Sequence, residues 1–262
     1  MCLLVVAWRC HPAYRLVVAA NRDEYHARAS APLAPWSDAA GIVAGRDLQA
    51  NGTWLAVDAH ARFGSVTNFR EFGRRKRSAP SRGGLIPAFL TQHGTAREYL
   101  QALETDAPGY AGFNLLLADE DSLWYASNRA DQFALPLSPG IYGLSNEFLD
   151  TPWPKLLRVK ARLAELLQMS PQPEALFEGL FAMLADREVA DPATLPESEL
   201  SPEWARKLSA PFVLDPTYGT RCSTVLTIGN DGALALVERR FDAAGASSGV
   251  TEHSLNAASS HR

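Results

Sequence analysis

The chain begins with an apolar strand, and this is the feature that most constrains its fold. Six apolar residues, Leu3 to Trp8, stand almost at the start of the chain. A continuous apolar run of this length is typical of a strand that is buried in a core. His11-Pro12-Ala13 indicates a turn, and Arg15 to Ala20 indicates a second strand. We therefore expect an N-terminal hairpin whose second strand ends where four polar residues, 21–24, begin.

Cys2 directly follows Met1, and aminopeptidases readily remove a methionine that precedes a small residue. Removal of Met1 would give Cys2 a thiol and a free α-amine on one residue. An α-amine titrates at about pH 7.7–8.0, against about 10.4 for lysine, so a neutral fraction can accept the thiol proton. The alternative is an inert cysteine that is buried in the first strand. Cys2 alone leaves both possibilities open.

Strands and helices follow one another in two rounds. Further strands are expected near residues 41–44, 53–57, 63–67, 113–118, 123–127, 141–144, 222–228 and 234–240. Helical spacing of apolar residues predicts helices near residues 85–92, 96–103, 155–168 and 174–185. Residues 32–35 and 192–216 contain prolines and are expected to be a loop and a surface excursion.

This order predicts an α+β fold in which helices cover both outer faces of two stacked, mainly antiparallel sheets. A doubly wound parallel sheet would require strict alternation of strands and helices, which the chain does not show. No internal repeat or linker divides the chain, so we expect one domain over residues 1–262. Glycine-rich nucleotide-binding loops are absent from the sequence.

Composition excludes several classes of protein. At 262 residues and 47% hydrophobic content, the chain can bury a large core, and its net charge of -4 gives no basic footprint for nucleic acid. The three cysteines lack C-x-x-C spacing, which argues against a disulfide framework or a structural zinc site. No stretch approaches the roughly 20 apolar residues of a membrane helix. We expect a cytoplasmic protein with no metal and no cofactor; its oligomeric state stays open.

Several motifs resemble a known family. They are MCLLVVAW, AANRDEYHARASAPLAPW, GRDLQANGTWLAV, SVTNFRE, SRGGL and YGLSNEFLDTPWPK. With them the chain resembles the NRDE-motif family of transport-and-Golgi-organisation type, least closely between about residues 170 and 215. That family in turn resembles the N-terminal-nucleophile hydrolases of the choloylglycine and penicillin V acylase kind, which also begin Met-Cys. The second resemblance implies a four-layer αββα sandwich.

The acylase resemblance also implies roles for particular residues. Cys2 matches the nucleophile, and Asp23 matches the aspartate that orients the terminal amine. Asn146 is similar to an asparagine of the oxyanion hole, and Asn68 falls near a second polar position of that site. Arg221 resembles a late-strand arginine that steadies the nucleophile.

One departure from the acylase pattern concerns an arginine three residues before the aspartate, where this chain has Ala20. Arg22 lies nearby, but adjacent residues on a strand face opposite sides, so whether Arg22 substitutes is left open. We expect Asn21, Arg22, Trp54 and Arg70 to contact the substrate. Arg70 also opens a basic segment, with residues 74–77 and 82, which is either a solvated loop or an anion clamp at the mouth of the site.

The leading functional hypothesis is a hydrolase of an amide or thioester with a small or lipid-like acyl group. The alternative is a binding or trafficking protein for haem, acyl-coenzyme A or another lipid-like ligand, which would use the same pocket without turnover. The family resemblance permits this alternative, because members are linked to haem mobilisation and lipid metabolism.

The hydrolase hypothesis requires a free α-amine on Cys2. Intact-mass spectrometry of the purified protein should therefore show the loss of one methionine from most molecules. A preparation in which every molecule retained Met1 would lack the base and would favour the binding protein.

Overall fold

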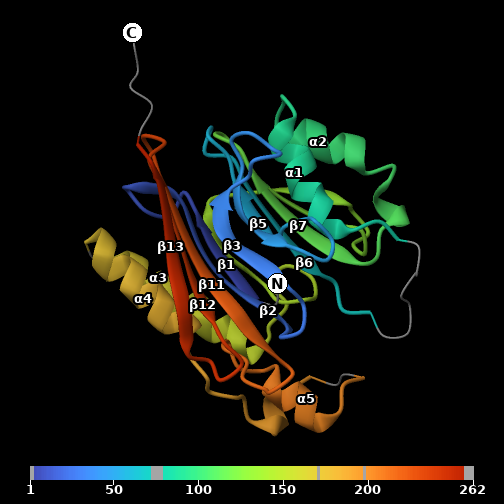
Figure 1. The fold of residues 1–262 in the computed structure, drawn as a ribbon, viewed down its shortest axis with the longest axis vertical. Coiled ribbons are helices and arrows are strands. Elements are labelled where there is room, and N and C mark those ends of the chain that lie inside the picture. Colours follow the sequence, from blue (N-terminus) through green and yellow to red (C-terminus); the bar gives the residue numbers. More distant parts are fainter. Residues whose placement is uncertain (1–2, 72–78, 170–171, 197–198, 257–262) are drawn as a thin grey trace.

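The computed structural model describes residues 3–71, 79–169, 172–196 and 199–256. Cys2 and the basic residues 74–77 lie outside the described residues. The described chain forms two antiparallel sheets with helices on their outer faces (Figure 1). No helix of this part of the chain is long and apolar enough to cross a membrane.

The first sheet contains the N-terminal hairpin at its centre. Its strand order is β10-β1-β2-β11-β12-β13, and all neighbouring strands are antiparallel. The strands are β1 (Leu3–Trp8), β2 (Tyr14–Tyr25), β10 (Gly140–Leu144), β11 (Tyr218–Gly229), β12 (Leu234–Phe241) and β13 (Ser247–Leu255).

The second sheet follows the order of the chain, β3 to β9, and is also antiparallel throughout. Its strands are β3 (Ser30–Pro35), β4 (Val43–Asp47), β5 (Leu55–Val57), β6 (Phe63–Asn68), β7 (Phe113–Ala118), β8 (Leu123–Ser127) and β9 (Ala134–Leu137). The helices are α1 (Leu85–Thr91), α2 (Ala96–Leu103), α3 (Pro154–Met169), α4 (Pro173–Leu184) and α5 (Pro202–Lys207). Three short 3₁₀ helices lie at Arg82–Gly84, Ala107–Gly109 and Pro192–Thr194.

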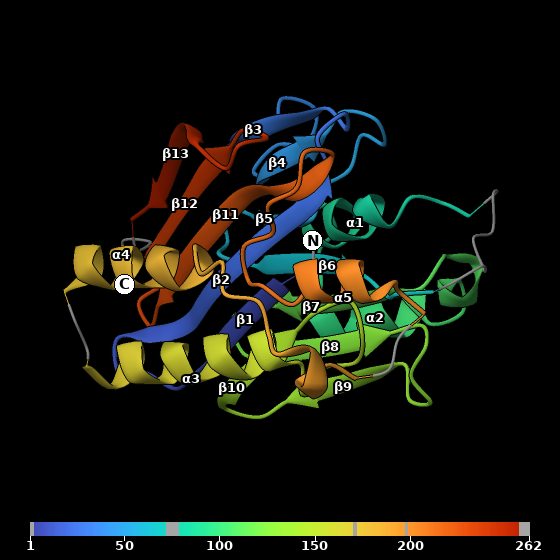
Figure 2. The same cartoon turned by 90° about the horizontal axis from the view of Figure 1, so that it is seen from below.

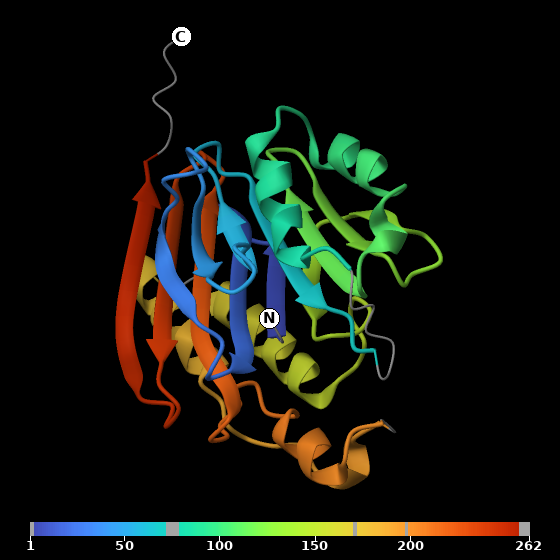
Figure 3. The same ribbon diagram turned by 45° about the vertical axis from the view of Figure 1, so that its right-hand side comes forward.

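Three apolar clusters define the layers. One fills the space between the sheets, a second joins α1 and α2 to the second sheet, and a third joins α3 and α4 to the first sheet. Figure 2 shows α3 and α4 side by side across the first sheet, and Figure 3 shows the two helix pairs on opposite sides of the stacked sheets. The predicted αββα order and α+β class are therefore confirmed.

The first strand explains how one apolar run serves two layers. Leu3 and Val5 pack against the helices, whereas Leu4 and Val6 face the second sheet. This division follows from the period of two along a strand. Each residue from Leu3 to Trp8 is buried, as the continuous apolar run predicts.

The predicted end of the second strand was wrong. β2 does not stop at Ala20 but continues through the polar residues to Tyr25, because β11 pairs with it along its whole length. The buried polar side chains in this extension find hydrogen-bond partners on distant segments, as Asn21 does on Ser223. A strand with satisfied polar groups can remain buried.

Other elements were also missed. The proline-containing segment 32–35 belongs to β3, which lies at the edge of its sheet, where prolines are tolerated. β13 is an edge strand of the first sheet and β9 is an edge strand of the second, and neither was predicted from the sequence. The expected excursion over residues 192–216 contains the short helix α5.

Two leucines of α3 test the packing of the helix layer. Leu163 is fully buried against the first sheet, whereas Leu157 is 54% exposed. Leu163→Ala should lower the free energy of unfolding by about 2–5 kcal/mol. The matched control Leu157→Ala should change it by no more than about 0.5 kcal/mol. Urea denaturation of both variants measures the difference, and equal effects would contradict this packing.

Candidate functional site

Four neighbouring strands of the first sheet bring most of the predicted site residues to one end. Leu3, the residue after Cys2, lies opposite Asn21, and Leu4 lies opposite Leu144 of β10. On the other side of β2, Asp23 lies opposite Thr220 of β11. The start of β1 is therefore flanked by residues 21–23 on one side and by residues 145–146 on the other.

Asn21 joins the first sheet to the helix layer. The residue is fully buried, and its side-chain amide donates to the carbonyl oxygens of Leu184 and Pro211, both at 2.9 Å. Its Oδ1 atom accepts a hydrogen bond from Ser223 Oγ at 2.6 Å. Both amide hydrogens are thus directed to backbone carbonyls. These contacts fix the end of α4 and the segment near Pro211 onto the sheet.

Asp23 faces the same side of β2 as Asn21, because the two residues are two positions apart. It is 3% exposed, and its Oδ1 atom accepts a hydrogen bond from Thr220 Oγ1 at 2.7 Å. Thr220 Oγ1 in turn accepts a bond from the backbone N–H of Val213 at 2.9 Å. The carboxylate is therefore held in a fixed position by a strand and a loop from late in the chain.

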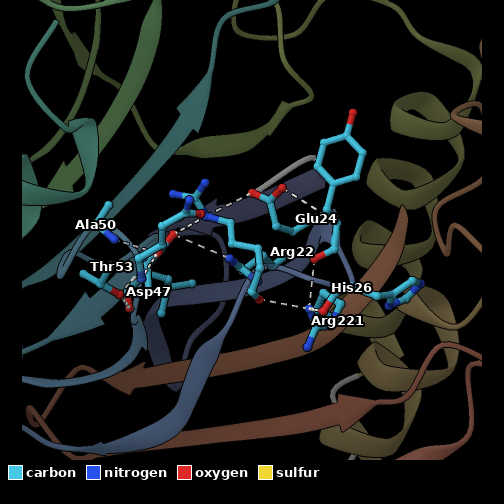
Figure 4. Close-up of polar contacts among 11 residues, drawn as sticks. Arg22, Glu24, His26, Asp47, Ala50, Thr53 and Arg221 are labelled. Atoms are coloured by element: carbon cyan, nitrogen blue, oxygen red, sulfur yellow. Dashed lines mark hydrogen bonds and ion pairs between the residues drawn. The ribbon is translucent and has the colours of Figure 1, made fainter. Parts of the chain in front are cut away.

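Arg221 occupies a bulge in β11, because the pairing with β2 shifts between Thr220 and Cys222. Its Nη1 atom donates to the carbonyl oxygens of Tyr25, His26 and Arg28 at 3.1–3.2 Å (Figure 4). Burial, followed by the nearby Arg22, lowers the pKa of the Arg221 guanidinium. The described contacts of Arg221 fix the chain that leaves β2.

Arg22 enters the layer between the two sheets. Its guanidinium lies over the Trp54 ring at 4.3 Å, and Nη2 is 3.7 Å from Asp47 Oδ2. Arg28 Nε donates to the same carboxylate oxygen at 2.6 Å (Figure 4). Burial acts to raise the pKa of Asp47, but the hydrogen bonds from Arg28 and from the backbone N–H groups of Ala50 and Gln49, together with the charge of Arg28, lower it overall.

The position of Arg22 is relevant to Ala20, which stands where the acylases have an arginine. Ala20 belongs to the cluster between the sheets, and Arg22 contacts Trp54 of the same cluster, so the two residues share one face of β2. Arg22 is 4% exposed, and its Nη1 atom has no hydrogen-bond acceptor among the described residues. A buried cation thus lies two positions along the same strand face from Ala20.

Trp54 has its place under Arg22 because Gly45 leaves room for it. A Cβ atom on residue 45 would lie 2.4 Å from Trp54 Cζ2. Trp54 itself is 7% exposed. In the part of the chain that the structure describes, Trp54 is therefore a wall of the intersheet core.

Cys222 and Glu238 form a second buried pair near Arg22. Burial raises the pKa of the Cys222 thiol well above its ordinary value, and Glu238 adds to the shift as a negative neighbour and hydrogen-bond partner. Burial also raises the pKa of Glu238, whose Oε1 atom accepts a bond from Leu33 N–H at 2.9 Å. The pKa of the Cys10 thiol is likewise raised by burial. Neither described cysteine is therefore an activated thiolate.

Asn146 connects the two sheets. Its backbone has φ of 59°, a left-handed conformation that asparagine adopts more readily than most residues. The side-chain Nδ2 donates to the carbonyl oxygen of Asn68 at 3.0 Å, and Arg70 N–H donates to the Asn146 carbonyl at 2.8 Å. Asn68 itself is exposed at the end of β6 and contributes its backbone to this contact.

Sequence reasoning missed Asn114, which supports the segment after Asn146. Asn114 is fully buried in β7; its Nδ2 donates to the Glu147 carbonyl at 2.8 Å, and its Oδ1 accepts from Tyr125 Oη at 2.8 Å. The only feature of the sequence that could have indicated its role is that it is the one asparagine within the apolar run 113–118. A buried amide in such a run needs partners from elsewhere in the fold.

No group of three or more His, Cys, Asp or Glu side chains that could hold a metal occurs among the residues that the structure describes. The arrangement instead offers a buried carboxylate, a buried guanidinium of Arg22, a half-buried guanidinium of Arg221 and an amide near the start of one strand. Such groups can orient an amine and stabilise negative charge.

The fold and the site define an αββα protein whose polar residues gather at the start of its first strand. A family model described as Transport and Golgi organisation 2 matches residues 1–243. The chain belongs to this family, as its motifs predicted.

Relatives from several animals match along most of their length. The Transport and Golgi organization protein 2 homolog of Bos taurus is 34% identical over 260 residues, covering 91% of this chain and 92% of the relative. The Homo sapiens homolog is 32% identical over 256 residues with the same coverage. Transport and Golgi organization protein 2 of Drosophila melanogaster is 27% identical over 265 residues, with 91% of each chain covered.

Among solved structures, the Caenorhabditis elegans ortholog of N-acylethanolamine-hydrolyzing acid amidase matches with a TM-score of 0.48 and 13% sequence identity. The match covers 86% of this chain and 92% of that chain.

The raised pKa of Glu238 predicts a pH effect on stability. The folded state binds the proton more tightly than the unfolded chain, whose carboxyl titrates near its ordinary value of 4.5. The contribution of Glu238 to stability should therefore fall as pH rises above the unfolded value. Glu238→Gln cannot titrate, so its stability relative to the native protein should increase over this range and then level off. Urea denaturation between about pH 4 and 8 measures this, and a constant difference would contradict the assignment.

Proposed function

We propose that the protein is a cytoplasmic hydrolase that uses Cys2 to cleave an amide or thioester of a small or lipid-like acyl group. The observation that carries this proposal is the register of the first sheet. It pairs Leu3 of β1 with Asn21, two residues before Asp23, and Leu4 with Leu144 of β10, two residues before Asn146. A nucleophile at residue 2 would then have an orienting carboxylate and an oxyanion donor close at hand.

The proposed reaction has two steps. The α-amine of Cys2 takes the thiol proton, the sulfur attacks the carbonyl carbon, and the carbonyl oxygen becomes an oxyanion. The ammonium then gives its proton to the leaving nitrogen or sulfur, the bond to the leaving group breaks, and an acyl-cysteine remains. A water molecule that loses its proton to the amine attacks this thioester, which releases the acid and restores the thiol.

The surrounding residues suit these steps. Asp23 would orient the ammonium, because a buried carboxylate held by Thr220 provides a fixed negative charge. Asn146 would donate to the oxyanion, and its bonds to Asn68 and Arg70 keep it in place. Asn68 and Arg221 would act by positioning, through the contacts described above.

We propose that Arg22 replaces the arginine that the acylases have at the position of Ala20. Its guanidinium occupies the face of β2 on which an arginine at position 20 would lie, and a positive charge in a buried layer favours a nearby thiolate. We therefore propose Arg22, stacked on Trp54, as the cation of the site. Asn21 would support the site from the helix side.

Ala20 is also compatible with the second hypothesis, a binding or trafficking protein without turnover. Without an arginine at that position, the same site could serve a carrier of haem, acyl-coenzyme A or another lipid-like ligand, and the names of the relatives refer to transport. Enzyme and carrier differ in what Cys2 does, and reactivity at Cys2 separates them.

A Cys2 nucleophile should be acylated by a β-lactone or an electrophilic ester faster than Cys10 or Cys222, whose pKa values are raised by burial. Cys2→Ser should retain the fold and reduce turnover at least about 10²-fold, and Asp23→Asn should slow acylation while the thiol remains. Peptide mapping by mass spectrometry measures the rate at each cysteine.

Cys10→Ser is the matched control and should leave acylation at Cys2 unchanged. If Cys2 in the folded protein reacts no faster than in denatured protein, while haem or acyl-coenzyme A still binds, the protein is a carrier and the hydrolase proposal fails.

A further inference from the structure

A small pocket lies next to the proposed oxyanion residue. Ser145, the neighbour of Asn146, forms part of its lining. The apolar walls come from the start of α3 and from the segment around α5: Trp153, Pro154, Leu195, Pro196, Leu200 and Leu208. The volume of about 20 Å³ is enough for a group the size of one or two water molecules.

Two hydrogen-bond donors of residues that line this pocket have no acceptor in the described part of the chain. The indole Nε1 of Trp153 is buried and has no hydrogen-bond partner among the described residues. The Arg70 guanidinium lies over the Trp153 ring at 5.7 Å. No carboxylate or carbonyl oxygen of the described chain pairs with this guanidinium, although the backbone N–H of Arg70 is bonded to Asn146. A buried donor normally has a partner, so the Trp153 indole N–H indicates an acceptor from outside the described chain, and the half-buried Arg70 guanidinium lies beside it.

A second cation strengthens the positive character of the pocket. Lys155 is 5% exposed, lines the pocket, and donates from Nζ to the Leu208 carbonyl at 2.7 Å. None of the lining residues in the described part of the chain is acidic. A charged amine in an apolar wall favours a negative group nearby, because the interaction between charges is stronger where water is excluded.

We propose that this pocket, lined by Arg70, Trp153 and Lys155, binds one small anionic group of a ligand whose short apolar part lies outside the pocket. A carboxylate fits the donors, because its two oxygens can accept from the Arg70 guanidinium and from Trp153 Nε1 together. A phosphate presents the same acceptor chemistry. The further statement that this anion belongs to the substrate rests on the proposed function, since the pocket adjoins Asn146.

The binding of small anions tests the pocket without any turnover. The protein contains six tryptophans, and each indole N–H gives a separate signal in a ¹H–¹⁵N spectrum. Trp153→Phe identifies the signal of Trp153 by its loss. Titration of the Cys2→Ser protein with butyrate, or with butyl phosphate, should shift that signal saturably, and the tighter of the two identifies the preferred anion. Butanol, which has the same tail without the charge, should not shift it.

Arg70→Met removes the charge and keeps most of the side chain, and it should weaken binding at least tenfold. Arg46→Met is the matched control, because Arg46 also stacks on a tryptophan, Trp36 at 4.2 Å, but does not line the pocket. Binding in this control should be unchanged. The proposal is overturned if neither anion shifts the Trp153 signal, if Arg70→Met binds as tightly as the parent, or if butanol has the same effect.

The two proposals can fail separately. Anion binding to the Cys2→Ser protein does not depend on the nucleophile. If Cys2 of the native protein is not acylated but the anion still binds, the hydrolase proposal fails and the anion-pocket proposal stands. Conversely, if Cys2 of the native protein is acylated normally but no anion binds, the anion-pocket proposal fails and the hydrolase proposal stands.

Discussion

The alternation of side chains along β2 is the constraint on which the candidate site depends. Successive residues of a strand face opposite sides, so Asn21 and Asp23 point toward the helix layer while Arg22 enters the layer between the sheets. A shift of the register by one residue would exchange these sides and bury Asp23 beside Trp54. Pairing with β1 on one side and β11 on the other fixes the register over the whole motif.

The two arginines of the site, buried Arg22 and half-buried Arg221, have compensating partners of different kinds. Arg22 has the Trp54 ring and the Asp47 carboxylate, and Arg221 has three backbone carbonyls. The raised pKa values of Glu238 and Cys222 favour the neutral forms of that pair. The intersheet layer therefore holds a cation without an activated thiolate among its described residues, which would leave reactivity to the N-terminal cysteine.

The parts of the fold with a regular apolar period were predictable. The first hairpin, the strands β7 and β8 and the helices α3 and α4 lie within a few residues of their predicted positions. The polar extension of β2 was not, because its stability depends on Ser223 and Thr220, about 200 residues away in sequence. Edge strands such as β13 face solvent and carry little apolar signal.

The site was predictable only as a set of residues. Motifs drew attention to Asp23, Asn146 and Arg221, and the register brings their segments to one end of the first sheet. Their individual contacts were not accessible, since Asn146 and Arg221 donate to backbone carbonyls of Asn68 and of Tyr25, His26 and Arg28, and Asp23 accepts from Thr220 late in the chain. Nor could the sequence reveal the pocket beside Ser145, whose donors come from Arg70 and Trp153 in separate parts of the chain.

The most direct test of the hydrolase proposal is a crystal structure of the protein after reaction with a β-lactone. We expect an acyl group bonded to Cys2 Sγ, with its carbonyl oxygen about 3 Å from the Asn146 amide and the Cys2 amine near Asp23. An acyl group on another residue, or one on Cys2 whose carbonyl oxygen points to solvent away from Asn146, would contradict it.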